Sequence, residues 1–188
     1  MIREASISRR EIEDRLAKVG DYVKMDYLQD CLKKKLDFDT KKFVLVKLAT
    51  IYESRKMYLE SGRLIKISAD INSTFEGKMR DFIKSAEMYI KGGNFEESDI
   101  SMTKAIAMAN ERQKVEIKIK LKELYKAQAK EFLRKDKRKH AMETYEKILT
   151  LNLDPLEKKE AQISLLSLYN KLGRIKDSFA LQKQISFG

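Results

Sequence analysis

The apolar residues of this chain recur at intervals of three and four, the spacing that gathers side chains on one face of an α-helix. Residues 45–52 follow it through Leu, Leu, Ala and Tyr, residues 82–89 through Phe, Ser, Ala and Tyr, and residues 125–132 through Tyr, Gln, Ala and Phe. In each segment the small residue allows a partner helix to approach, and the aromatic residue that follows fills the space above it. The pattern predicts amphipathic helices that pack in pairs.

Polar residues mark where these helices begin. Ser8, Ser73, Asn94 and Asp154 each precede a Glu by three positions, which is the spacing of a capping box. Pro155 then occupies a first helical position, where its missing N–H costs nothing. Glycines supply further breaks between helices. We therefore expect ten helices in five hairpins, over 9–19 with 21–35, 40–55 with 57–72, 74–91 with 95–110, 111–134 with 137–152, and 155–172 with 174–186.

A short motif recurs at the hairpin turns. It reads glycine, polar residue, aromatic or aliphatic residue at 20–22, 93–95 and 173–175, and degenerate copies lie at 56–58 and 136–138. The residues three positions further on are spaced by 36, 37, 43 and 37, namely Met25, Ser61, Ser98, Ala141 and Ser178. A period of this length predicts stacked helical pairs. Because no linker interrupts the chain, we expect a single domain over 1–188, with repeats at 9–35, 40–72, 74–110, 111–152 and 155–186.

Composition supports an all-α fold and limits the chemistry. Of the 188 residues 43% are apolar and 37% charged, with one proline, seven glycines and no tryptophan, which suits long helices better than hairpins of strands. The single cysteine, Cys31, excludes an internal disulfide and a thiolate metal site. The N-terminus lacks the apolar core of a signal peptide, and no stretch approaches a membrane span. We expect a soluble cytoplasmic protein without membrane insertion, metal or cofactor.

The net charge of +11 is concentrated in one segment. Residues 111–140 hold 12 Lys and Arg against 5 Asp and Glu. Within it a basic residue stands at every fourth position, at Lys114, Lys118, Lys122, Lys126, Lys130 and Arg134. Each step of four turns a helix by about 40° past a full circle, so the ladder winds around the helix and only neighbouring members share a face. It is either a solvated surface or a binding surface for an acidic partner.

No set of residues predicts catalysis. His140 is the only histidine and lies far in sequence from Cys31, so no nucleophile and base pair is indicated. Cys31 shares helical spacing with leucines and is expected to be buried. Asp37 and Asp39 are expected to cap the helix that begins near Thr40, since no calcium loop surrounds them. The glycines at 92 and 93 follow no strand, so phosphate binding is not indicated. We expect a protein that is not an enzyme.

The fourth hairpin carries the closest match to a known repeat signature, in which an aromatic, a small and an aromatic residue precede a small and an aromatic residue of the next helix. Its members are Tyr125, Gln128, Ala129, Phe132, Ala141 and Tyr145. These residues resemble the tetratricopeptide repeat. The copies at 45–65, 82–102 and 166–178 keep the twelve-residue interval to the small residue of the second helix, and a half-copy precedes them at 20–32.

This resemblance implies a right-handed α-α superhelix whose first helices line an inner groove. The family's groove positions fall in this sequence on Val46, Thr50, Glu53, Arg80, Ile83, Glu87, Lys91, Lys126, Lys130, Arg134, Ile163, Ser167 and Asn170. The deeper half of such a groove would be basic. Thr50 and Lys84 replace the asparagines of the clamp that binds chaperone tails, so that ligand is not expected.

Two functions follow from these observations. The leading hypothesis is a non-enzymatic interaction module or scaffold that presents a partly basic groove to a peptide or partner helix. The bound segment is expected to be acidic where it meets Lys126, Lys130 and Arg134. The alternative is nucleic-acid binding through residues 111–140, although the aromatic residues there occupy core positions. We also expect a homodimer or partner contact through the C-terminal repeat, where Leu181 and Ile185 lie on a helix that no later repeat covers.

Overall fold

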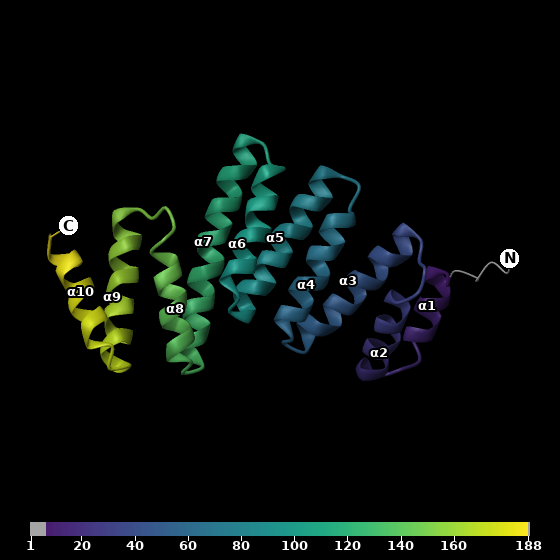
Figure 1. Ribbon diagram of the computed structural model, residues 1–188, viewed down its shortest axis with the longest axis horizontal. Coiled ribbons are helices and arrows are strands. Elements are labelled where there is room, and N and C mark those ends of the chain that lie inside the picture. The colour runs from purple at the N-terminus through teal and green to yellow at the C-terminus, as the bar shows by residue number, and fades with distance from the viewer. Residues whose placement is uncertain (1–6, 188) are drawn as a thin grey trace. The chain divides into compact units, whose positions relative to one another are not determined.

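The computed structural model describes residues 7–187 of the chain. The N-terminal residues 1–6, part of the segment in which no signal peptide is expected, lie outside them. All the regular elements of the described residues are α-helices (Figure 1). They are α1 Arg9–Leu16, α2 Asp21–Leu32, α3 Phe38–Ser54, α4 Tyr58–Ile71, α5 Phe75–Gly92, α6 Phe95–Ala107, α7 Glu111–Arg134, α8 Arg138–Ile148, α9 Pro155–Lys171 and α10 Ile175–Phe187. The expectation of an all-α fold with ten helices is confirmed. Within the described chain, no helix is both long and apolar enough to cross a bilayer.

The capping residues explain where several helices begin. Ser8 and Asp154 form complete capping boxes, and the side chain of Asn94 accepts from the N–H of Glu97, all as the sequence predicts. Asp37 caps α3, but the helix begins at Phe38, earlier than expected, and Asp39 lies in its first turn. The expected cap of α5 is wrong by one residue. Thr74, and not its neighbour, accepts from the N–H of Gly77, at 3.1 Å.

The turns inside four hairpins share one backbone geometry. The second residue before the start of the second helix has a left-handed backbone, with φ of 62° at Lys56, 78° at Gly93, 53° at Asp136 and 68° at Gly173. The next N–H closes the turn on the carbonyl oxygen five residues earlier, at 2.8–2.9 Å, with Tyr52, Tyr89, Phe132 and Tyr169 as acceptors. The degenerate motif copies therefore make the same turn as the glycine copies. The first copy does not, because Gly20 is an extended N-cap.

Contacts divide the chain into two compact units, Met1–Gln113 and Lys114–Gly188. We call them the N-terminal unit and the C-terminal unit and describe each by itself. The single-domain organisation stays a prediction. The boundary falls near the start of α7, whose 24 residues make it the longest helix and account for the one long repeat interval.

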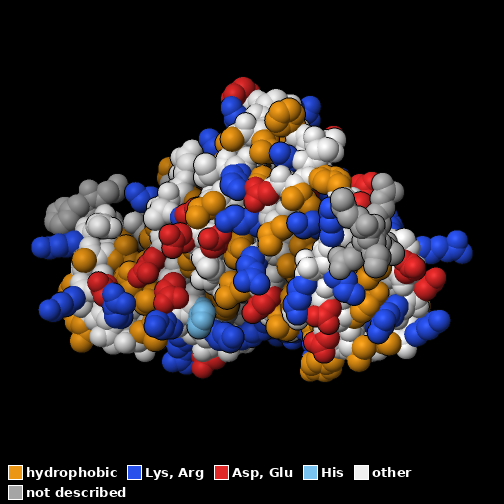
Figure 2. Space-filling view, turned by 45° about the vertical axis from the view of Figure 1, so that its right-hand side comes forward, with side chains coloured by type: hydrophobic (Ala, Val, Ile, Leu, Met, Phe, Trp, Pro, Cys, Tyr) orange, Lys and Arg blue, Asp and Glu red, His pale blue; other side chains and the backbone are white. Residues whose placement is uncertain are grey.

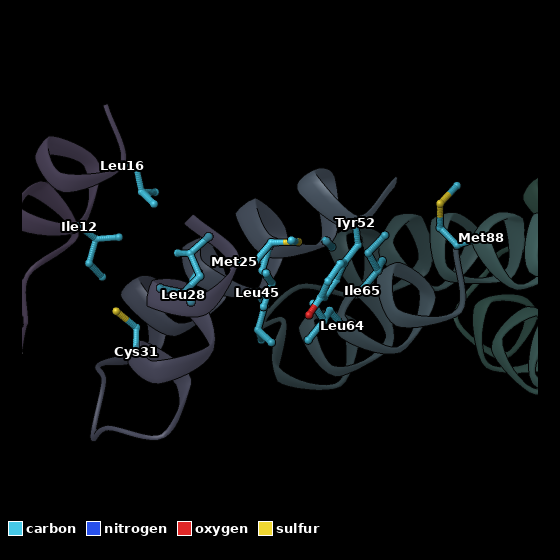
Figure 3. Packing of buried hydrophobic residues seen from close by; sticks show 13 residues of the cluster. Ile12, Leu16, Met25, Leu28, Cys31, Leu45, Tyr52, Leu64, Ile65 and Met88 are labelled. Atoms are coloured by element: carbon cyan, nitrogen blue, oxygen red, sulfur yellow. The ribbon is translucent and has the colours of Figure 1, made fainter. Parts of the chain in front are cut away.

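In the N-terminal unit one apolar cluster runs from α1 to α5. Figure 3 shows its side chains in a row, with Ile12 and Leu16 at one end and Met88 at the other. Cys31 is fully buried within it, as expected. The cluster holds successive helices together through shared apolar neighbours and not through separate pairwise contacts.

Small polar residues bring these helices close together. The hydroxyl of Ser61 on α4 donates to the carbonyl oxygen of Ala49 on α3, at 2.9 Å across the twelve-residue interval. The hydroxyl of Ser85 on α5 donates to the carbonyl oxygen of Gly62 on α4, at 2.8 Å. A Cβ atom at Gly62 would lie 3.2 Å from the ring of Tyr89, so this helix crossing leaves little room for a side chain.

The C-terminal unit has its own apolar cluster. Phe132 of α7 and Ala141 and Met142 of α8 pack with α9 and α10, and Figure 1 shows α7 beside α8 and α9 beside α10. Leu181 is buried in this cluster and Ile185 packs against it. The expectation that these two residues lie uncovered is therefore wrong. Their side of α10 faces α9, and the exposed apolar residues of α10 are different ones.

Candidate functional site

Four charged side chains form one network on α3 and α5, which are the first helices of two successive hairpins in the N-terminal unit. The ammonium of Lys84 on α5 lies 2.9 Å from Glu53 on α3 and 3.5 Å from Glu87. Lys91 lies 2.6 Å from Glu87 and 3.6 Å from Glu53. Two acidic and two basic side chains thus neutralise one another across α3 and α5.

The environment keeps this network charged. Burial would raise the pKa of Glu87, but the hydrogen bond from Lys91 and the charge of Lys84 outweigh it and lower that pKa overall. Burial likewise opposes the charge of Lys91, and Glu87 and Glu53 raise its pKa in spite of it. Glu87 and Lys91 are therefore both charged at neutral pH, and their charges are satisfied within the network.

In the C-terminal unit the first helices α7 and α9 are joined through Glu157. Its Oε1 accepts from Lys126 at 2.7 Å, and its Oε2 accepts from Lys122 at 2.8 Å. Glu157 is also the third residue of α9, and its Oε2 accepts from the N–H of Asp154 at 3.0 Å. The hydrogen bonds from Lys122, from Lys126 and from this backbone N–H lower the pKa of Glu157 to about 2. The same capping box that starts α9 therefore orients the carboxylate toward α7.

Beside this junction lies an open pocket of about 650 Å³ formed by α7, α8 and α9. Apolar and aromatic residues make up part of its lining, and charged residues the rest. The residues are Glu123, Lys126, Ala127, Lys130, Tyr145, Ile148, Glu157, Glu160, Ala161, Ile163 and Ser164. Lys130 is exposed, and no described carboxylate pairs with it, whereas Lys126 is held by Glu157.

The pocket is of mixed charge and not uniformly basic. Glu123, Glu157 and Glu160 line it together with two lysines. Figure 2 likewise shows Lys and Arg side chains interspersed with Asp and Glu over the face it presents. The expected basic half of the groove is thus moderated by carboxylates that come from α9 as well as from α7.

Several predicted groove residues come together in these two places. Glu53, Glu87 and Lys91 meet in the N-terminal network, while Lys126, Lys130 and Ile163 meet at the C-terminal pocket.

The other predicted groove residues lie apart from both. Arg134 makes two hydrogen bonds of 2.8 Å to Glu131. Asn170 accepts from Ser178 at 2.6 Å, and Ile83 packs against the cluster around Phe82. Four more are exposed without joining either site, namely Val46, Thr50, Arg80 and Ser167.

Three residues of these two sites were not among the predicted groove residues. Lys84, Lys122 and Glu157 complete the two sites. A signal for them is present in the sequence, because the pairs Glu53 with Lys84 and Lys126 with Glu157 are both separated by 31 residues. A third pair, Lys66 on α4 with Glu97 on α6, has the same separation.

The two residues considered for a nucleophile and base pair, Cys31 and His140, belong to different units. His140 is exposed, and its ring lies 5.3 Å from that of Phe132. Cys31 is buried in the other unit. Among residues 7–187 no group of three or more His, Cys, Asp or Glu side chains is arranged to hold a metal ion.

Comparisons with known proteins identify no family. No family model matches the chain, and no curated protein matches it. Among solved structures, the crystal structure of BtubC (BKLC) from P. vanneervenii aligns with 93% of this chain and 75% of its own, at 14% sequence identity and a TM-score of 0.38. A likeness at this level carries no argument about fold or function.

Proposed function

We propose that this chain is a non-enzymatic interaction module of tetratricopeptide-like hairpins, which bind a partner segment along their first helices. The observation that carries the proposal is the junction of α7, α8 and α9, where Lys126 and Glu157 join successive first helices beside a pocket of about 650 Å³. We infer that the hairpins form a right-handed superhelix whose first helices line its inner side. Such a surface supplies side chains for recognition without a catalytic set.

Regular contacts between hairpins support the repeat assignment. The hydroxyl of Tyr52 contacts the side chain of Gln29, and the hydroxyl of Tyr169 donates to Glu146 at 2.8 Å, both across 23 residues. The four left-handed turns stand at the same place in four hairpins, and the ion pairs of Glu53 with Lys84 and of Lys126 with Glu157 each span 31 residues between successive first helices. Repeated contacts of this kind are expected where each hairpin packs only on its neighbours.

The pocket indicates what the partner segment offers. Lys130 provides an unpaired cation, and Ile163 provides an exposed apolar side chain on the facing helix. Glu123 and Glu160 disfavour a uniformly acidic ligand. We therefore expect a peptide or helix that places one carboxylate beside Lys130 and an apolar side chain on Ile163, in a cytoplasmic setting.

The test compares two charge reversals of equal size. Lys130→Glu changes the pocket, whereas Lys139→Glu changes an exposed lysine on α8 that does not line it. Proteins bound by the unchanged chain are identified by affinity purification and mass spectrometry, and the shortest binding segment is titrated against both variants. Lys130→Glu should lower its affinity about tenfold, and Lys139→Glu should leave it unchanged. Equal binding by both variants contradicts the pocket assignment.

A second candidate function, nucleic-acid binding, is favoured by the turn between α7 and α8. Arg134–His140 is exposed throughout, and Figure 2 shows Lys and Arg around the pale-blue histidine. Lys137 and Lys139 have no acidic partner among the described residues, although Tyr125 and Phe132 are buried and cannot stack on bases. Labelled RNA and duplex DNA should then bind at low salt and dissociate at higher salt, and Lys137→Glu with Lys139→Glu should abolish binding. Absence of binding at low salt removes this candidate.

A further inference from the structure

The last helix, α10, carries apolar side chains on a face that no described helix covers. Ile175 is 64% exposed and Phe179 is 67% exposed, and Leu172, just before the helix, is exposed as well. On the opposite side of α10, Leu181 packs into the apolar cluster of the C-terminal unit. The exposed residues form a separate surface, which we call the α10 face: Leu172, Ile175 and Phe179.

The repeat register shows what occupies this position in earlier hairpins. Phe179 directly follows Ser178, and the corresponding residues of the earlier hairpins are Asp26 in α2, Gly62 in α4, Asp99 in α6 and Met142 in α8. In the N-terminal unit Gly62 is buried, and its carbonyl oxygen accepts from Ser85 of α5. The position in α4 thus receives the first helix of the next hairpin.

The same holds within the C-terminal unit. Met142 of α8 is 4% exposed, and it belongs to one cluster with Leu165, Leu168 and Tyr169 of α9. These three residues stand at the helical spacing of three and four, so one stripe of α9 covers the position. The α10 face therefore corresponds to the two positions, in α4 and α8, at which a following helix packs, and as in α8 its residue there is apolar.

The charges around the α10 face select the occupant. Residues 171–187 contain four basic side chains and one acidic side chain, Asp177. The carboxylate of Asp177 forms an ion pair with Arg174 at 2.5 Å. Lys171, Lys176 and Lys183 are exposed and have no carboxylate partner among the described residues. Two copies of this surface would repel each other, whereas an acidic helix would be attracted to it.

We propose that the α10 face docks an amphipathic helix of a partner protein, with an apolar stripe that covers Phe179 and acidic residues that meet Lys176 and Lys183. This surface is separate from the pocket of α7, α8 and α9, and the two can be tested independently.

The chain itself provides the probe. A synthetic peptide of residues 155–171 contains the stripe that covers Met142. Its acidic version carries Lys158→Glu, Lys159→Glu and Lys171→Glu, and its basic version carries Glu157→Lys and Glu160→Lys. Both labelled peptides are titrated against the full chain by fluorescence anisotropy, against Phe179→Gln, and against Phe75→Gln, a matched change of an exposed phenylalanine on α5.

The acidic peptide should bind with a Kd below about 100 µM and at least about tenfold more tightly than the basic one. Phe179→Gln should weaken it at least about tenfold, while Phe75→Gln should leave it unchanged. Absence of binding, equal binding of the two peptides, or an unaffected Phe179→Gln variant overturns the proposal. Sedimentation of the full chain tests for a second copy as the occupant of the α10 face. A dimer that the Phe179→Gln substitution dissociates would identify that second copy and would also overturn the proposal.

Discussion

In the N-terminal unit, every lysine that joins α3 and α5 has a carboxylate, whereas the C-terminal unit leaves Lys130 unpaired beside a pocket. Glu53 and Glu87 match Lys84 and Lys91 within one network. In the C-terminal unit one carboxylate, Glu157, holds both Lys122 and Lys126. Ion pairs thus join successive first helices in both units, but only in the C-terminal unit does a lysine beside them stay unpaired.

The difference shows that the number of basic residues is a poor guide to a binding surface. A salt bridge between partly exposed side chains contributes little to stability, yet it removes both charges from recognition of a partner. The unpaired lysine and the apolar side chains around it therefore matter more for binding than the length of the basic ladder.

The largest effect tests whether the two units are equally well packed. Phe82 in the N-terminal unit is 1% exposed, and Phe132 in the C-terminal unit is 5% exposed. Phe82→Ala and Phe132→Ala should each lower the free energy of unfolding by about 3–5 kcal/mol. Urea denaturation followed by circular dichroism measures the loss, and amide exchange shows which helices open. A loss below about 1 kcal/mol for Phe132→Ala would mean that the C-terminal cluster is not packed as described.

A smaller effect concerns the left-handed turns, which use glycine in one hairpin of each unit and a side-chain-bearing residue in the other. Gly173 has φ of 68° and open space around its missing Cβ, so Gly173→Ala adds backbone strain alone. It should cost about 1–2 kcal/mol. Lys56→Gly, at φ of 62°, removes strain and should gain up to about 1 kcal/mol. Thermal denaturation measures both changes, and equal signs for the two would contradict the shared geometry.

A third prediction concerns the exchange of serine and alanine at two corresponding positions, Ser61 and Ala141. Ser61 donates to Ala49 in the N-terminal unit, whereas Ala141 makes no such bond in the C-terminal unit. Ser61→Ala should cost about 1 kcal/mol, because it removes a buried hydrogen bond without leaving a cavity. Ala141→Ser should be nearly neutral if the new hydroxyl reaches the carbonyl oxygen of Ala129. A Ser61→Ala variant as stable as the unchanged chain would show that close packing alone holds these helices.

The smallest effect is a dependence on acid. The pKa of Glu157 is lowered from 4.5 to about 2 by Lys122, Lys126 and the backbone of Asp154, and that of Glu131 is lowered to about 2 by Arg134 and Lys135. A carboxylate with a lowered folded pKa stabilises the fold above its ordinary pKa, and this contribution is lost as the pH falls from about 4.5 toward 2.

Glu157→Gln should therefore reduce the loss of stability over this pH range. The remaining loss reports Glu131 and the other carboxylates. Urea denaturation at pH 7, 4.5 and 2.5 measures it, with Glu160→Gln as a control from the same helix. Identical pH profiles for Glu157→Gln and the unchanged chain would contradict the triple pairing of Glu157.

The helices and their turns were largely predictable from the sequence because both depend on local rules. Apolar spacing marks the helices, and the degenerate motif at Lys56 and Asp136 marks turns that glycine makes elsewhere. The assignment of Thr74 as the cap of α5 was missed, since Ser73 has the better spacing to a glutamate and only the backbone path decides between them.

The site was predictable only in part. The resemblance to the tetratricopeptide repeat named Lys126 and Lys130, but not the carboxylate that distinguishes them. Glu157 was read from local spacing as a helix cap, which it is. Its contacts with α7 depend on how far α9 is shifted along α7, and no local pattern determines that shift. For the same reason the sequence does not show that Leu181 packs into the cluster with α9.

Glu157 also bears on the order in which the C-terminal unit assembles. Its bond to the N–H of Asp154 closes a loop of three residues, while its bonds to Lys126 and Lys122 close loops of 31 and 35 residues. Short loops close sooner than long ones because they restrict the chain less. We therefore expect the carboxylate to be oriented before α7 docks, so that the first turn of α9 guides the packing of the preceding first helix.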